Sequence, residues 1–229
     1  MMSRATLDKK IKQLMDDIQD LRGMVVNATR RSVAALRAHD VEAAHQIYKD
    51  DAQINEKRFK LESSCIITIA TQQPIVAKDL RLLASILEVV GEMERMGDYA
   101  KGIAKACILI GEVPHIKPLV DIPIMTDLVI SMLNRSVTAF VNQDAEGALL
   151  IPAEDDAVDK LYDQVYRDLV KVMLDNPAAV EQANHLLWVA HNLERMADRV
   201  TNICERTIYA ATGVMEEINA SDDESIIPV

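Results

Sequence analysis

The strongest constraint on this chain is a short acidic motif that occurs twice. Residues 94–98 read Glu-Arg-Met-Gly-Asp, and residues 194–198 read Glu-Arg-Met-Ala-Asp. In each copy the Glu and the Asp are four residues apart, so on a helix they lie on one face, about 5–6 Å apart at Cβ. Two carboxylates in that relation repel each other and weaken the helix slightly. Their repetition predicts that a cation, or a basic partner, lies between them in each copy.

Composition and periodicity both favour helices over strands. Gly and Pro number 7 each among 229 residues, and aromatic residues make up 3%. Apolar side chains recur every three to four residues, which predicts long amphipathic helices and an all-α protein. Prolines at 114, 118 and 123 predict a linker at 112–123. The expected helices cover 4–38, 41–71, 75–110, 124–141, a fifth that ends near 174 and is started or kinked by Pro152, and 177–212.

The repeat extends beyond the acidic motif. The sequence Asp51-x-x-Ile-Asn55 aligns with Asp155-x-x-Val-Asp159 at an offset of 104, against 100 at the later motif. We therefore predict two tandem, pseudo-symmetric three-helix bundles built from six long helices. The first repeat would cover residues 1–113 and the second 119–217, and 218–229 would be a frayed acidic tail.

The second helix of each repeat carries its own pair of polar oxygens, again four residues apart. If the two helices face each other, each repeat offers four oxygen ligands, as in the carboxylate metal sites of helix bundles. The candidate ligands are Glu94, Asp98, Asp51 and Asn55 in the first repeat, and Glu194, Asp198, Asp155 and Asp159 in the second. Two residues without such a counterpart, Asn202 and His191, are possible additional ligands of the second site. Oxygen ligands alone admit iron, manganese, magnesium, calcium or zinc.

The alternative interpretation of these acidic residues is a solvated face with local salt bridges from Arg95 and Arg195. Two other classes of protein share the pattern: a metal-free helical scaffold of the spectrin type, and a di-metal carboxylate enzyme. The enzyme would need a Glu-x-x-His pair at its carboxylate site on each of two helices, but the two acidic motifs have Gly97 and Ala197 three residues after their Glu. The sequence also has no Gly-rich phosphate loop, H-E-x-x-H or G-x-S-x-G motif. We therefore do not expect an enzyme.

Net charge and cysteine content limit which ligands and which cellular compartment are expected. The net charge of −11 argues against nucleic-acid binding and suits a cation or a basic protein partner. Cys65, Cys107 and Cys204 are odd in number and form no C-x-x-C motif, which indicates reduced, buried cysteines in the cytoplasm. We expect no signal peptide, because the N-terminus has no apolar segment, and no membrane span, because the apolar runs are short.

The two acidic motifs, together with Asp79-Leu-Arg81 and Asp51-x-x-Ile-Asn55, resemble the PhoU family over about residues 5–215. The resemblance implies two similar three-helix bundles in a cytoplasmic protein. It also implies a negative regulator of high-affinity phosphate uptake and phosphate-starvation signalling. Such a regulator would contact the phosphate ABC transporter and its sensor histidine kinase, and would reach the membrane only through these partners. We further expect a homodimer.

The resemblance also implies metal at the acidic motifs, since family members carry iron clusters in some cases and zinc or nickel in others. For this chain we expect iron or zinc. The motif residues would be direct ligands and the facing carboxylates would complete the sites: Glu94, Asp98, Glu194 and Asp198, with Asp51, Asp155 and Asp159 opposite. Asn55 and Gly102 depart from the second repeat's Asp159 and Asn202. We therefore predict that the second repeat binds metal more tightly.

Overall fold

The computed structural model describes residues 4–72, 74–215 and 218, and within these it contains helices and no strand. The all-α prediction is confirmed. The helices are α1 (Arg4–Ala38), α2 (Val41–Thr71), α3 (Ala77–Ile110), α4 (Asp121–Asn142), α5 (Ala145–Leu150), α6 (Asp155–Asp175) and α7 (Val180–Thr212), with 3₁₀ turns η1 (Pro152–Glu154) and η2 (Pro177–Ala179). Of the predicted acidic tail, 218–229, all but Ile218 lies outside the described residues.

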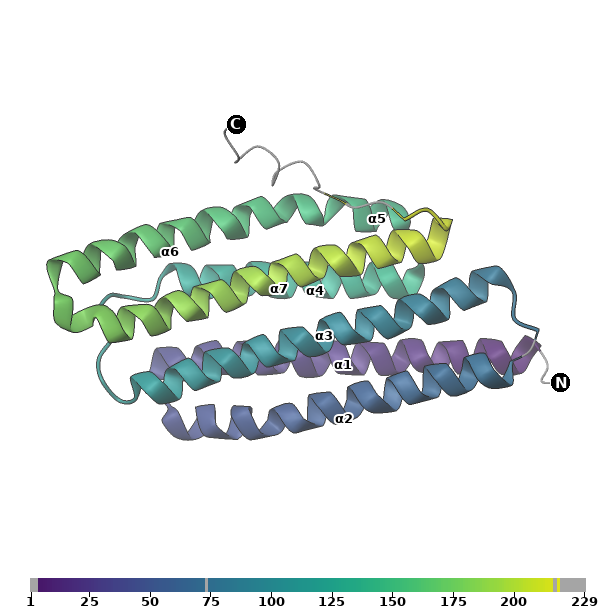
Figure 1. Ribbon diagram of the computed structural model, residues 1–229, viewed down its shortest axis with the longest axis horizontal. Helices are drawn as coiled ribbons and strands as arrows, with labels where there is room; N and C mark the ends of the chain where they lie inside the picture. The colour runs from purple at the N-terminus through teal and green to yellow at the C-terminus, as the bar shows by residue number, and fades with distance from the viewer. Residues whose placement is uncertain (1–3, 73, 216–217, 219–229) are drawn as a thin grey trace, which may run out of the picture.

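The helices form two bundles that pack against each other along one side. Helices α1, α2 and α3 make the first, and α4 to α7 make the second (Figure 1). Helices α3 and α7 run side by side between the bundles and make the most extensive helix–helix contact. The buried apolar side chains form one core that continues from one bundle into the other. The predicted pair of tandem, pseudo-symmetric bundles is therefore confirmed.

The two repeats reverse the chain in the same way after their first helix. His39 and Gln143 adopt left-handed backbone conformations with φ of 56° and 53°. The side chains of Asp40 and Asp144 then accept hydrogen bonds of 2.9 Å from backbone N–H groups three residues later. Such caps satisfy donors that the first turn of a helix leaves free, so each aspartate fixes the start of the helix that follows.

The second helix differs between the repeats. In the first repeat α2 is continuous, whereas its counterpart is divided into α5, η1 and α6. The division falls at Pro152, which has no N–H to donate and whose ring obstructs the preceding turn. As a result Asp155 begins a helix, while the equivalent Asp51 lies within one. The expected fifth long helix is therefore two helices joined by a 3₁₀ turn.

The linker between the repeats is shorter than predicted. We expected the fourth helix to begin at residue 124, but α4 begins at Asp121 and includes Pro123 in its first turn. The first turn tolerates proline because its N–H groups have no acceptor within the helix. The third helix, in contrast, begins later than predicted, at Ala77 and not at residue 75.

Helix α4 has the length and apolar composition that would cross a membrane, with a mean hydropathy of 1.3 over its most apolar 18 residues. We had expected no membrane span because the apolar runs are short, and that argument did not identify this helix as a candidate. Its apolar side chains are used in the core, where Met125, Met132 and Phe140 are fully buried and the helix packs on α1 and α7. By its packing α4 is a core helix. The three cysteines are buried and unpaired in the described chain, as expected.

Candidate metal centre

In the first repeat, the aspartate of the second helix is bound to a lysine of the third. Asp51 on α2 is only 5% exposed, and its Oδ2 atom lies 2.7 Å from Lys101 Nζ on α3. The hydrogen bond from Lys101 to Asp51 raises the pKa of the lysine, which is therefore charged at neutral pH. Asn55 also donates to Asp51 Oδ2, at 3.2 Å. Two of the four candidate ligands thus already have partners.

The motif carboxylates of the first repeat are also next to basic side chains. Glu94 Oε1 lies 2.9 Å from Arg58 Nη1 on α2, and Asp98 Oδ1 lies 3.8 Å from Lys101 Nζ. The cation predicted between the acidic residues is therefore supplied here by Lys101 and Arg58 of the chain itself. Metal binding at this pair would require these basic groups to give up their present partners.

The small residue in the motif allows a close helix contact. A Cβ atom on Gly97 would lie 3.0 Å from Ile54 Cγ2 on α2, and 3.8 Å from Asp51 Oδ1. The absence of a side chain at Gly97 therefore brings α3 against α2 beside the acidic residues. Ala197 at the equivalent position of α7 is fully buried.

In the second repeat, four carboxylates repel one another. Burial, followed by repulsion from Asp159, Asp198 and Glu194, raises the pKa of Asp155 to about 7. Burial and repulsion from Asp198 and Asp159 likewise raise the pKa of Glu194 to about 7. The pKa values of Asp159 and Asp198 are also raised, mainly by burial. Helices α6 and α7 thus bring together all four predicted ligands of the second repeat, in an environment that opposes their negative charge.

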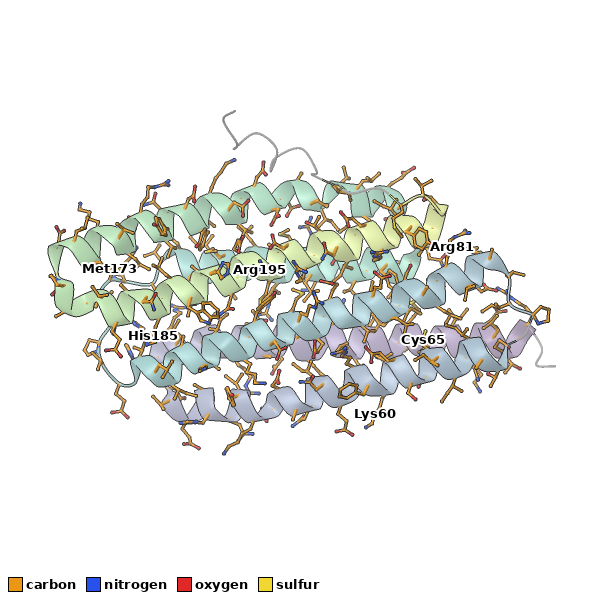
Figure 2. The ribbon with its side chains drawn as sticks, viewed as in Figure 1. Lys60, Cys65, Arg81, Met173, His185 and Arg195 are labelled. Atoms are coloured by element: carbon orange, nitrogen blue, oxygen red, sulfur yellow. The ribbon has the colours of Figure 1, made fainter. Side chains whose placement is uncertain are left out.

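Two oxygen atoms of this cluster have no hydrogen-bond partner in the described part of the chain, although both are buried: Asp155 Oδ1 and Glu194 Oε2. His191 Nδ1 lies 3.2 Å from Glu194 Oε2 but does not meet hydrogen-bond geometry, and burial lowers the pKa of this histidine. Arg195, labelled on α7 in Figure 2, reaches Asp198 at 3.8 Å. The expected salt bridge from Arg195 is present but long, and Arg95 instead lies 3.9 Å from Glu92.

The basic side chains beside the two carboxylate clusters differ because two aligned positions hold different residues in the two repeats. Lys101 aligns with Thr201 at the offset of 100, and Arg58 aligns with Tyr162 at the offset of 104. Neither Thr nor Tyr carries a positive charge at neutral pH, so the second cluster lacks the cations that neutralise the first. The sequence analysis did not identify Lys101 and Arg58 as partners of the acidic residues. Extending the repeat alignment to these positions would have found them.

Asn202 lies at the contact between the repeats. Its Nδ2 donates to Glu92 Oε2 on α3 at 3.2 Å, and Arg199 Nη1 approaches the same oxygen at 3.3 Å. The amide nitrogen of Asn202 therefore contributes to the interface between α3 and α7, and the predicted role of its amide oxygen as a metal ligand stays a prediction.

The two carboxylate clusters differ in how well their side chains could bind a metal ion. Among the described residues, no three or more His, Cys, Asp or Glu side chains stand in an arrangement that would hold a metal ion as they are. The second cluster nevertheless offers four carboxylates with two buried, unpartnered oxygens, which is a donor set for a hard or borderline cation. The first cluster fits less well, because Lys101 and Arg58 already pair with Asp51 Oδ2 and Glu94 Oε1, although Asp51 Oδ1 is buried without a hydrogen-bond partner among the described residues.

Similarity to known proteins covers almost the whole chain. The family model described as "PhoU domain" matches residues 18–107 and 122–207, one match in each repeat. The PhoU homolog of Aquifex aeolicus, a phosphate-specific transport system accessory protein, is 37% identical over 207 residues, which are 90% of this chain and 93% of that protein. The homolog of the same name from Clostridium acetobutylicum is 33% identical over 218 residues, covering 95% of this chain and all of its own.

Solved structures agree with the sequence similarity. The crystal structure of the phosphate transport system regulatory protein PhoU from Streptococcus pneumoniae superposes with a TM-score of 0.85 at 29% identity, over 93% of this chain and 100% of that one. PhoU from Pseudomonas aeruginosa gives a TM-score of 0.83 at 30% identity, over 90% and 99%. The two matched domains, the relatives and the shared fold together place this chain in the PhoU family.

Proposed function

We propose that this protein is an accessory component of a phosphate-specific transport system, in which it restrains phosphate uptake. Membership of the PhoU family supports the proposal, since the curated relatives carry that accessory role in their names. The solved relative from Streptococcus pneumoniae is described as a regulatory protein. These names describe accessory and regulatory proteins, so we further propose that the chain acts by contact and not as an enzyme.

The proposed partners are the high-affinity phosphate ABC transporter and the sensor histidine kinase of phosphate starvation. Contact would take place in the cytoplasm, with the protein as a homodimer that meets the membrane only through these partners. The net charge of −11 suits a basic surface on such a partner.

Metal in the second repeat is part of the proposal. The single observation that carries it is the pair of buried, unpartnered oxygens, Asp155 Oδ1 and Glu194 Oε2, within the described part of the chain. Burying a carboxylate without a partner is costly, and a cation would remove that cost. Asp155, Asp159, Glu194 and Asp198 would hold the ion, with iron or zinc as the proposed metals. The ion would supply positive charge to four mutually repelling groups.

The four proposed ligands lie on two different helices, so the charge at the site can change how these helices pack. Asp155 and Asp159 belong to α6, whereas Glu194 and Asp198 belong to α7. Neutralised carboxylates would let the two helices stay close, and repelling carboxylates would push them apart. The angle between α6 and α7 would then set the surface that the second repeat offers to a transporter or kinase.

Phosphate uptake in cells tests the proposal. Cells that lack this protein should take up labelled phosphate faster in phosphate-rich medium, and the wild-type protein should restore the restraint. The Asp155→Asn/Glu194→Gln variant, which keeps the side-chain shapes, should fail to restore it at an equal protein level. Asp163→Asn, an exposed change on α6, should act as wild type.

Two results would contradict the proposal at different points. Unchanged uptake in cells that lack the protein would overturn the role in phosphate transport. Full restoration by the Asp155→Asn/Glu194→Gln variant would leave that role in place and overturn the part assigned to the metal.

A further inference from the structure

The contact between α3 and α7 has an approximate twofold symmetry that relates residue i to residue i+100. On one side, Asn202 Nδ2 of α7 lies 3.2 Å from Glu92 Oε2 of α3. The symmetric positions are Gly102 and Asn192, and a Cβ atom on Gly102 would lie 2.9 Å from Asn192 Nδ2. The same positions therefore meet on both sides, so the two halves of the contact can be compared residue by residue.

One half of this contact is filled by ion pairs. Arg206 Nε lies 2.7 Å from Glu88 Oε2, and Arg199 Nη1 lies 3.3 Å from Glu92 Oε2. These long side chains cross from α7 to α3 and occupy the space between the helices.

The other half is open. Ala106 stands where the filled half has Arg206, and Gly102 stands where it has Asn202. A cavity of about 520 Å³ occupies this place, within the range of small-molecule sites. It lies between the end of α3 and the first half of α7, where Figure 2 labels His185, and α6 adds one side. The side chains that define its chemistry are Lys105, Tyr162, Asn184, His185, Trp188 and His191.

The cavity lining combines positive charge with aromatic rings. None of the described residues that line it is acidic, although the chain has a net charge of −11. The ring of His191 lies 5.9 Å from that of Trp188 and 6.2 Å from that of Tyr162, measured between centroids. Trp188 is nonetheless 54% exposed, so its indole is available to a ligand.

A buried amide lies beside Gly102, one of the residues that line the cavity. Asn192 is 3% exposed, and its Nδ2 has no hydrogen-bond partner among the described residues. A Cβ atom on Gly102 would lie 2.9 Å from this Nδ2, so only a glycine at this position leaves room for the amide. An unpaired buried amide is costly.

We propose that this cavity binds a small anion that carries a planar heteroaromatic ring, the chemistry of a nucleoside monophosphate. The rings of Trp188 and Tyr162 offer faces on which a base can stack. Lys105 offers positive charge to the phosphate group, and His185 offers a ring nitrogen as a hydrogen-bond donor. This site goes beyond the proposed role in phosphate transport and needs no metal.

Trp188 gives a direct measurement, because it is the only tryptophan in the chain. Titration with AMP should change its fluorescence to saturation. Adenosine and inorganic phosphate, which each carry half of the ligand's chemistry, should bind at least about tenfold more weakly. No saturable change up to about 10 mM AMP would overturn the proposal. Phosphate binding as tightly as AMP would overturn the role of the aromatic rings and leave a simple anion site.

Two variants locate the site. Lys105→Glu, a change at an exposed position, should weaken AMP binding at least about tenfold, whereas Lys9→Glu makes the same charge change on α1 and should leave binding unaltered. The Trp188→Glu/Ala106→Arg variant places the Glu88–Arg206 pair of the filled half into the open half. Calorimetry should then detect no AMP binding. Wild-type affinity in either cavity variant would contradict the assignment.

Discussion

Lys101 and Asp51 form an ion pair of 2.7 Å between α3 and α2, and the position equivalent to Lys101 in the second repeat holds Thr201. The second cluster thus lacks the lysine that pairs with the buried aspartate of the first, although Arg195 lies 3.8 Å from Asp198. The sequence similarity of the two acidic motifs conceals this difference. In the first repeat a lysine pairs with the buried aspartate, whereas in the second repeat burial and mutual repulsion raise the pKa values of Asp155 and Glu194 to about 7.

Replacing Lys101 by the residue of the second repeat should destabilise the first bundle. Lys101→Thr leaves Asp51, which is 5% exposed, without its charged partner. Breaking a buried ion pair costs several kcal/mol, and because Lys101 is partly exposed we expect a loss of about 2–3 kcal/mol. Urea unfolding measures this loss. Lys60→Thr breaks the exposed pair with Glu56 and should cost less than about 0.5 kcal/mol; equal losses in both variants would contradict the account.

The reciprocal change should supply the missing cation to the second repeat. In Thr201→Lys, an ammonium group would lie where Lys101 lies in the first repeat and would neutralise the cluster around Asp155. We expect the affinity for metal to fall at least about tenfold, measured by calorimetric titration of chelator-treated protein. Thr138→Lys, at an exposed position of α4, is the matched control. Metal affinity that is unchanged in Thr201→Lys would show that the cation positions are not equivalent.

The stability of metal-free protein should depend on pH in a definite direction. Folding raises the pKa of Asp155 and Glu194 to about 7. Their contribution to stability is therefore fully present below about pH 4, the unfolded pKa, and is lost as pH rises through 7. With allowance for coupling and partial exposure, we expect the free energy of unfolding to fall by about 1–2 kcal/mol between pH 6 and 8.

This pH effect is isolated by a difference measurement in the presence of a chelator. Burial lowers the pKa values of His115 and His191. The stability that these two histidines contribute to the protein is therefore lost as pH falls below about 6.5, which is opposite in sign to the carboxylate effect. The Asp155→Asn/Glu194→Gln variant retains both histidines. Subtracting its pH profile from that of the wild type should cancel the contribution of His115 and leave the carboxylate effect, together with any change at His191, whose Nδ1 lies 3.2 Å from Glu194 Oε2. A difference that is flat, or that rises toward pH 8, would be inconsistent with the raised pKa values.

Gly97 and Gly91 on α3 should respond oppositely to the same substitution. A Cβ on Gly97 would lie 3.0 Å from Ile54, whereas a Cβ on Gly91 would meet no described atom within 4 Å. Gly97→Leu should therefore force α2 and α3 apart and cost about 2–3 kcal/mol. Gly91→Leu should stabilise by about 0.5–1 kcal/mol, since leucine favours the helix more than glycine does. Thermal unfolding compares the two, and similar behaviour would rule out close packing at Gly97.

Most of the fold could be predicted from the sequence, because helical periodicity and the caps at Asp40 and Asp144 are local signals. The start of α4 was predicted wrongly, because Pro123 lies in a first turn, where proline is tolerated. The prediction that Pro152 starts or kinks the fifth helix agrees with the break observed there, but the sequence did not show that the helix would be divided in two.

The site could be predicted only in part. Helical spacing brought Glu194 and Asp198 onto one face, and the repeat supplied Asp155 and Asp159 opposite them. The partners of the first cluster depend on how α2 and α3 pack, which sets whether a lysine seven residues beyond Glu94 reaches Asp51. The cavity beside Trp188 depends on small residues from a different helix, so no local pattern in α7 predicts it.

The most direct test of the account is elemental analysis of protein purified without chelator or affinity metal. Wild-type protein and Asp98→Ala, an exposed change in the first repeat, should contain equal, stoichiometric metal. The Asp155→Ala/Asp159→Ala variant should contain none. Metal retained at the wild-type level in that variant, or no metal in the wild type, would contradict a metal centre in the second repeat.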